Sequence, residues 1–163
     1  MKPTLGTQLR HLIELLDGAV SASYEKAGLD YRPRYTPVMR SLMKQEPATI
    51  GFIAEVAGIT QPAATQTVAL MLKDGLISVE AGVKDGRQKL IRLSPLGREL
   101  IPQLEKCWKA TAGAAASLEA DVANSLSDTL DQAIAALAAK SYGERIAEAR
   151  ARLEAGAPTT DLS

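Results

Sequence analysis

Neutral hydrogen-bonding side chains are concentrated in residues 60–67, where hydroxyl and amide groups stand among alanines and no large apolar residue occurs. An amide can form a two-point hydrogen-bond pair with an adenine edge, a hydroxyl can bond to bases or phosphates, and an alanine methyl can pack against a thymine methyl. On one short helix these residue types predict contact with DNA bases. The candidates are Thr60, Gln61, Ala63, Thr65 and Gln66. Ala64 ranks lower because it is also expected to fill the core.

Basic side chains surround an Asp-Gly pair a little further along the chain, in residues 84–89. Asp-Gly between two β-capable runs is a strong hairpin signal. An arginine at a hairpin tip can enter a narrow minor groove, while lysines beside it neutralise phosphates, so we assign these roles to Arg87, Lys84 and Lys89. We also expect the Asp85 carboxylate to accept a bond from the Arg87 guanidinium and fix its direction. A plain turn at Asp85 is compatible with this role.

Two short helices must position the neutral side chains. Thr49 is suited to cap a helix over 50–57, Gly58 suits a tight turn, and Thr60 caps the next helix, which ends near Asp74. Pro62 falls in the first turn of that helix, where its missing N–H has no cost. Residues 64, 68, 71 and 72 are expected to be its buried face. This arrangement projects the start of the second helix into a major groove.

Strands over 76–80 and 88–93 complete the central lobe, and helices are expected on both sides of it. They cover 5–27, 38–44, a long helix that opens at Ser94-Pro95, and 125–153 with a break near Gly143. The fold class is therefore mainly α with a small antiparallel β-hairpin. We expect one subunit over 1–155, with a winged helix-turn-helix lobe over about 30–93, dimerisation helices over 1–29 and 94–155, and a flexible tail over 156–163.

The apolar stripes of the terminal helices predict a second copy of the chain. Helices of this length cannot hide their apolar residues on a core supplied by about eighty central residues, so part of that surface is expected to form a homodimer interface. The N-terminal stripe consists of Leu5, Leu9, Leu12, Ile13, Leu16, Val20, Tyr24 and Ala27.

Composition excludes several classes of protein. One cysteine and one histidine cannot form an intramolecular disulfide or a Cys/His zinc cluster, so neither a metal nor a cofactor is expected. The chain has no glycine-rich phosphate loop and no nucleophile at a recognisable distance from a base, which argues against an enzyme. No apolar run is long enough to span a membrane, and residues 1–20 carry charges where a signal peptide would be apolar. A cytoplasmic location is expected.

The 19 basic and 19 acidic residues cancel, so total charge does not indicate a nucleic-acid partner.

Three stretches together resemble the MarR family of bacterial transcription regulators: RYTPVMRSL (34–42), TIGFIAEVAGITQPAATQTVALMLKDGLI (49–77) and DGRQKLIRLSPLGREL (85–100). The last contains the family's Asp-x-Arg signature at Asp85 and Arg87. The resemblance implies a winged-helix homodimer that binds double-stranded DNA, with each subunit reading half of a palindromic site. The first helix and the last two would form the dimer interface, and Thr49 would contact phosphate. Gly86 stands where the family often has a basic residue, and the recognition helix has no arginine.

The resemblance also implies a small aromatic effector, bound between the dimer helices and the DNA-binding lobe. The residues that would line its cleft are His11, Tyr31, Arg34, Tyr35, Met39, Met43 and Trp108. Ordinary packing is an equally good reading of each of them. Cys107 is open to two readings, a redox switch or an inert small hydrophobe. A winged helix that docks proteins without binding DNA is the alternative to a regulator.

Overall fold

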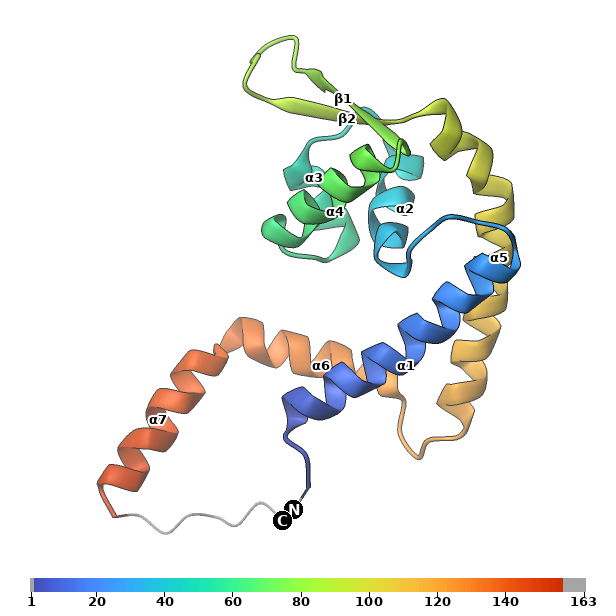
Figure 1. Ribbon diagram of the computed structural model, residues 1–163. Coiled ribbons are helices and arrows are strands. Elements are labelled where there is room, and N and C mark those ends of the chain that lie inside the picture. The colour runs from blue at the N-terminus through green and yellow to red at the C-terminus, as the bar shows by residue number, and fades with distance from the viewer. Residues whose placement is uncertain (1, 157–163) are drawn as a thin grey trace. The chain divides into compact units, whose positions relative to one another are not determined.

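The computed structural model describes residues 2–156, so most of the predicted tail lies outside the described residues. The chain divides into two compact units, Met1–Thr111 and Ala112–Ser163. The elements, labelled in Figure 1, are α1 (Leu5–Lys26), a 3₁₀ turn η1 (Pro33–Tyr35), α2 (Thr36–Lys44), α3 (Ile50–Ala57), α4 (Gln61–Lys73), β1 (Ile77–Ala81), β2 (Lys89–Leu93), α5 (Pro95–Ala120), α6 (Leu126–Ala139) and α7 (Tyr142–Glu154). The mainly helical fold with one antiparallel hairpin confirms the predicted fold class.

Helix α1 presents most of its predicted apolar stripe to solvent. Thr4 caps its first turn, and the chain turns away at Gly28, which has a φ of 73°. Leu5, Ile13 and Leu16 are 64%, 55% and 44% exposed, whereas Tyr24 near the C-terminal end is buried. Only the last part of α1 therefore packs on the core of the first unit.

The segment before α2 is more regular than predicted. We expected Pro33 to keep residues 29–35 out of helical structure and α2 to begin at Val38, but η1 covers Pro33–Tyr35 and α2 begins at Thr36. Proline is tolerated in a first turn because its φ is already helical and its missing N–H has no partner there. The Tyr35 N–H then donates to the Arg32 carbonyl at 2.9 Å.

The helix-turn-helix has the predicted boundaries. Thr49 Oγ1 accepts from the Phe52 N–H and Thr60 Oγ1 from the Ala63 N–H, each at 3.2 Å, so both threonines cap their helices. Gly58 has the positive φ, 66°, that the turn between the helices requires. These local contacts fix where α3 ends and α4 begins.

The buried face of α4 differs from the prediction at one position. Ala64, Val68 and Met71 are buried as expected, but Leu72 is 47% exposed and Thr67 is buried instead. At about 100° per residue, Leu72 lies roughly 80° from Ala64 around the helix, at the edge of the apolar stripe, while Thr67 lies closer to its centre. The prediction for Leu72 was wrong.

The hairpin pairs Ile77 with Leu93 and Ala81 with Lys89, each strand starting one residue later than predicted. Ala48, just before α3, forms a bridge with Ile91, with N···O distances of 3.0 and 2.8 Å. This bridge attaches the base of the hairpin to the helix-turn-helix. Figure 1 shows the hairpin tip extending beyond the helices of the lobe.

The core of the first unit joins all of its helices to the hairpin. Its fully buried large side chains include Tyr35 and Met39 from η1 and α2, Ile53 from α3, Met71 from α4 and Leu104 from α5. Burial of one such side chain stabilises the fold by about 1.5–3 kcal/mol. The helix-turn-helix and the hairpin thus share one core.

In the second unit, α6 and α7 meet at Ser141. Ser141 and Glu144 form a capping box, and the break between the two helices therefore lies just before Gly143, near the predicted position. Glu119 caps the other end of α6, since its carboxylate accepts from the Leu126 and Ser127 N–H groups at 2.8 and 2.9 Å. The apolar side chains of α6 and α7 are exposed, Ile134 at 67% and Ile146 at 50%.

Candidate nucleic-acid interface

The outer face of α4 carries the predicted base-contacting residues. Gln61, Thr65 and Gln66 are exposed, whereas Ala63 is half-buried and Ala64 is fully buried. Ala64 therefore belongs to the core, as its lower ranking anticipated. Thr60 is exposed, and its hydroxyl already accepts the Ala63 N–H of the helix cap.

The starts of α3 and α4 lie close together. A Cβ added at Gly51 would lie 3.7 Å from the Gln61 amide nitrogen and 3.9 Å from the Thr49 hydroxyl oxygen. Gln61 therefore folds back toward the first turn of α3, where Thr49 is half-buried and acts as the cap. The helix N-terminus adds unpaired N–H groups to this region, and such groups favour an anion such as a phosphate.

Exposed residues that sequence reasoning did not include complete the α4 surface. Pro62 and Ala69 are exposed on the same side as Thr65. Their spacing of three and four residues from Thr65 was the available signal, since residues so spaced share a helix face. The surface is neutral until Lys73, the last residue of α4.

The tip of the hairpin is an exposed, mostly basic turn. Lys84, Asp85, Arg87 and Lys89 are all exposed, and Val83 beside them is 99% exposed. Within residues 2–156, none of the three basic side chains takes part in an ion pair. The charges at the tip therefore face solvent and are available to a ligand.

Asp85 shapes this turn through the backbone and not through the expected guanidinium contact. Its Oδ1 accepts from the Arg87 backbone N–H at 2.9 Å, and its carbonyl accepts from the Gln88 N–H at 3.0 Å. An aspartate at the first position of a turn makes this local bond readily, because its short side chain reaches the N–H two residues on. The expected bond to the Arg87 side chain is corrected accordingly, and the guanidinium is left unpaired.

Lower on the hairpin, Arg92 is paired with Glu80. Its Nε lies 2.9 Å from the Glu80 Oε1 across the two strands, on a diagonal, since Arg92 is in register with Ser78 and Glu80 with Leu90. An exposed pair of this kind adds little stability. It does occupy Arg92, so the hairpin cations that form no ion pair within residues 2–156 are those at its tip.

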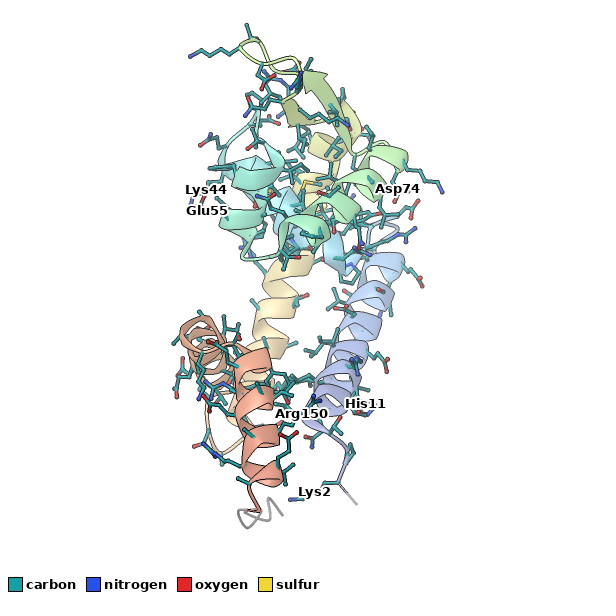
Figure 2. All side chains as sticks on the ribbon, turned by 90° about the vertical axis from the view of Figure 1, so that its left-hand side faces the viewer. Lys2, His11, Lys44, Glu55, Asp74 and Arg150 are labelled. Carbon is teal, nitrogen blue, oxygen red and sulfur yellow. The ribbon has the colours of Figure 1, made fainter. Side chains whose placement is uncertain are left out.

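The residues predicted to line an effector cleft differ widely in their burial. Tyr31, Tyr35 and Met39 are buried, whereas Arg34 and Met43 are exposed and Trp108 is half-buried. His11 is exposed on α1, and Figure 2 shows it well away from Asp74 at the end of α4.

Packing inside the lobe accounts for the buried tyrosines. The Tyr24 and Tyr31 rings, and the Tyr31 and Tyr35 rings, meet edge to face with centroids 5.0 and 5.6 Å apart. Trp108 Nε1 donates to the Tyr24 hydroxyl at 3.0 Å, and the Arg40 guanidinium lies over the Trp108 ring. Tyr24 and Arg40 were not among the expected residues, because these contacts join segments far apart in the sequence.

Two open pockets flank α2. One, of about 400 Å³, includes Met43, Glu46 and Arg98, the last two forming an ion pair. The other, of about 480 Å³, includes Thr36, Arg40 and Lys44 from α2 and the end of α3. Met43 is the one predicted effector residue that lines either pocket. Cys107 lines neither of them and packs half-buried against the core.

A helix-turn-helix followed by a two-stranded hairpin on a shared core defines a winged-helix domain. Residues 28–88 match the model of the MarR family. An uncharacterised HTH-type transcriptional regulator of Staphylococcus aureus strain Mu50 is 35% identical over 63 residues, 39% of this chain and 43% of the relative. Over these residues the chain resembles the MarR family, and it spans less than half the length of the curated relatives that it matches.

Solved structures share this fold over most of the chain. The M. tuberculosis transcriptional regulator MosR, determined in complex with DNA, aligns with a TM-score of 0.64 and 23% identity over 85% of this chain and 98% of that one. The Streptomyces coelicolor regulator PcaV, determined with its natural ligand, aligns with a TM-score of 0.57 and 19% identity over 86% of this chain and 99% of that one. At these identities the likeness to both structures is one of fold.

None of the helices in residues 2–156 is long and apolar enough to cross a membrane. In the same residues, His, Cys, Asp and Glu side chains form no group of three that is suited to hold a metal ion.

Proposed function

We propose that the protein is a sequence-specific DNA-binding transcription regulator that acts as a homodimer on a palindromic site. The observation that carries this proposal is the joint exposure of the outer face of α4 and the unpaired cations of the hairpin tip. The first is a surface of base-reading chemistry and the second is a surface of phosphate-binding chemistry. Both are held by one core, so they can contact one duplex together.

Gln61, Thr65 and Gln66 are the proposed base readers. Their amides and hydroxyl are free on a helix face that buries its opposite side in the core. Thr60 and Thr49 cap the two helices, and their helix N-termini are suited to contact phosphates. The half-buried Ala63 offers a methyl group beside them.

The hairpin is proposed to supply much of the affinity. Arg87 would enter a minor groove, and Lys84 and Lys89 would neutralise phosphates on either side. Asp85 supports this role indirectly, because it holds the backbone of the turn that presents Arg87.

The dimer is proposed from the exposed apolar side chains. Leu5, Ile13 and Leu16 on α1 and Ile134 on α6 are each more than two-fifths exposed in the single chain. Several large apolar side chains exposed on a helix mark an interaction surface. A second copy of the chain would cover them and place two α4 helices on successive half-sites of the DNA.

We propose a small aromatic effector as the regulatory ligand. The support is the ligand-bound structure of PcaV, which shares the fold, together with the aromatic and basic side chains around α2. The pocket beside Arg40 and Lys44 is cationic, which suits an acidic effector. Which of the predicted cleft residues contact the effector depends on the effector's chemical structure.

A regulator of this kind acts on chromosomal DNA, so we place the protein in the cytoplasm and assign it no enzymatic reaction.

DNA binding is tested by titrating the purified protein against labelled genomic fragments at about 50 and 200 mM salt. We expect a subset of fragments to be retained at both salt concentrations, with affinity falling steeply as salt rises because bound phosphates release counterions. A winged helix that only docks proteins would retain no fragment in preference to another. That outcome would favour the docking module over the regulator.

A further inference from the structure

The inner face of α4 is held by hydrogen bonds from η1. Arg34 Nη2 donates to Thr67 Oγ1 at 3.3 Å, and the Tyr35 hydroxyl donates to Asp74 Oδ2 at 2.6 Å. Thr67 and Asp74 are seven residues apart, which places them on the same side of the helix within about 20°. Two consecutive residues of η1 therefore hold the middle and the end of α4.

This attachment lies on the side of α4 away from the proposed base readers. Thr67 is 3% exposed and Tyr35 is fully buried, so Tyr35 cannot touch a ligand on the outer face. Thr65 and Ala69 lie about 160° around the helix from Thr67. A change at Tyr35 can alter DNA binding only through the position or mobility of α4.

The bond between Tyr35 and Asp74 is short and chemically well defined. Burial, helped by the bond to the Asp74 carboxylate, raises the pKa of Tyr35 to about 12, so the hydroxyl remains a donor at all physiological pH values. Arg32 adds a second contact, since its Nε lies 4.0 Å from the same carboxylate oxygen and its guanidinium lies over the Tyr35 ring. Figure 2 shows Asp74 at the C-terminal end of α4, on the α1 side of the lobe.

The same tyrosine is the end of a series of aromatic contacts that reaches the long helices. Tyr35 packs edge to face on Tyr31, Tyr31 packs on Tyr24 of α1, and Tyr24 accepts a hydrogen bond from Trp108 of α5. Close-packed side chains have little room to move and therefore transmit strain. The three packed tyrosine rings are thus a suitable support for α4. α4 is thus braced against α1 and α5 through η1.

We propose that Tyr35 and Asp74 are positioning residues for DNA binding, whose hydrogen bond fixes the outer face of α4 relative to the hairpin tip. This inference rests on the proposed function. According to this proposal, two side chains that do not face the DNA increase the affinity for it by holding α4 in position.

The test compares Tyr35→Phe with Tyr31→Phe in the full chain. Both changes remove one hydroxyl from a buried tyrosine and keep the ring, but Tyr31 donates to Thr36 and not to α4. The measurements are the dissociation constant for a retained DNA fragment, the melting temperature and hydrogen exchange of the α4 amides. We expect Tyr35→Phe to weaken binding at least fivefold and to speed exchange in α4, and Tyr31→Phe to stay within twofold of the wild type.

Substitutions at Asp74 separate the hydrogen bond from the charge. Asp74→Asn keeps an acceptor for the Tyr35 hydroxyl and is expected to bind DNA within about twofold of the wild type, whereas Asp74→Ala should match Tyr35→Phe. The double variant Tyr35→Phe/Asp74→Ala should bind no worse than either single variant, because both remove the same bond.

The outcomes test the positioning role of Tyr35 and Asp74 separately from the proposed DNA-binding function. Wild-type affinity and wild-type exchange in Tyr35→Phe would overturn the positioning role while leaving the proposed function intact. An equal loss of melting temperature and affinity in Tyr31→Phe would show that both tyrosines only stabilise the lobe, and would also overturn it. A wild-type protein that retains no DNA would overturn the proposed function, and unchanged α4 exchange in Tyr35→Phe would then separately refute the brace.

Discussion

Replacing Arg87 with alanine is expected to weaken DNA binding at least about tenfold without unfolding the protein. The side chain is exposed at the hairpin tip and pairs with no carboxylate in residues 2–156, so its loss leaves no buried group unsatisfied. The turn itself should persist, because Asp85 bonds to the backbone N–H at position 87, which alanine retains. The substitution removes the guanidinium that would lie in a minor groove or on a phosphate. DNA affinity falls because the counterions that this group would displace are no longer released.

The measurement is a DNA titration of Arg87→Ala at several salt concentrations, with Lys106→Ala as the control. Lys106 is exposed on α5 and carries the same charge, so its removal changes the net charge equally. We expect the slope of log affinity against log salt to fall by about one for Arg87→Ala and to stay unchanged for the control. Equal effects of both substitutions would mean that only net charge matters, and unchanged affinity of Arg87→Ala would remove the wing from the mechanism.

Replacing Gly97 with alanine is expected to destabilise the lobe by about 3 kcal/mol or more. A Cβ at this position would lie 2.2 Å from the Leu76 carbonyl oxygen, a backbone atom that cannot move aside alone. That carbonyl already accepts the Ser94 N–H at 3.0 Å, and Ser94 caps α5 through the Gly97 N–H. Overpacking in a well-packed site costs about 1–3 kcal/mol, and a contact with fixed backbone is at the upper end.

Thermal unfolding of Gly97→Ala measures this effect, and Gly113→Ala provides the control in the same helix. No heavy atom lies within 4 Å of a Cβ added at Gly113, so alanine there should be neutral or stabilising through its higher helix propensity. We expect a fall of about 6–12 °C in melting temperature for Gly97→Ala. A fall of the same size in the control would show that α5 does not tolerate substitution at either glycine. The close approach to Leu76 would then not explain the loss of stability.

Local signals in the sequence were sufficient for the helix-turn-helix. Thr49, Gly58 and Thr60 act through bonds and dihedral angles within a few residues, and so α3 and α4 have their predicted bounds. The same reasoning was less accurate for segments whose structure depends on tertiary contacts. Ala48 bridges to Ile91 across 43 residues, and this pairing has no signature near Ala48.

Errors of a second kind came from periodicity and turn chemistry. Leu72 lies at the margin of the apolar stripe of α4, where the pattern alone assigns it to the core but geometry leaves it exposed. Asp85 was matched to the guanidinium of Arg87, although the backbone N–H of a turn is closer to a short carboxylate than the end of a long arginine is. For Leu72 the angle around the helix decided the outcome, and for Asp85 the short reach of its carboxylate to the backbone decided it.

The candidate DNA surface could be located from the sequence, while the support behind it could not. Gln61, Thr65 and Gln66 are exposed on α4 as expected of base readers, and their contacts with DNA remain a prediction. The bond from Tyr35 to Asp74 joins residues 39 positions apart, and the sequence left Tyr35 open to two readings, an effector cleft or ordinary packing. Its ring is buried and its hydroxyl bonds to the end of α4, as ordinary packing predicts.

The most direct test of the central claim is to sequence the DNA that the purified protein retains from a random pool at moderate salt. A homodimer with two α4 helices predicts enrichment of an inverted repeat whose half-site centres lie about 10 base pairs, or a multiple of one helical turn, apart. Retained DNA with no common sequence, or no retained DNA, would contradict the account of α4 and the hairpin tip as a surface that reads DNA.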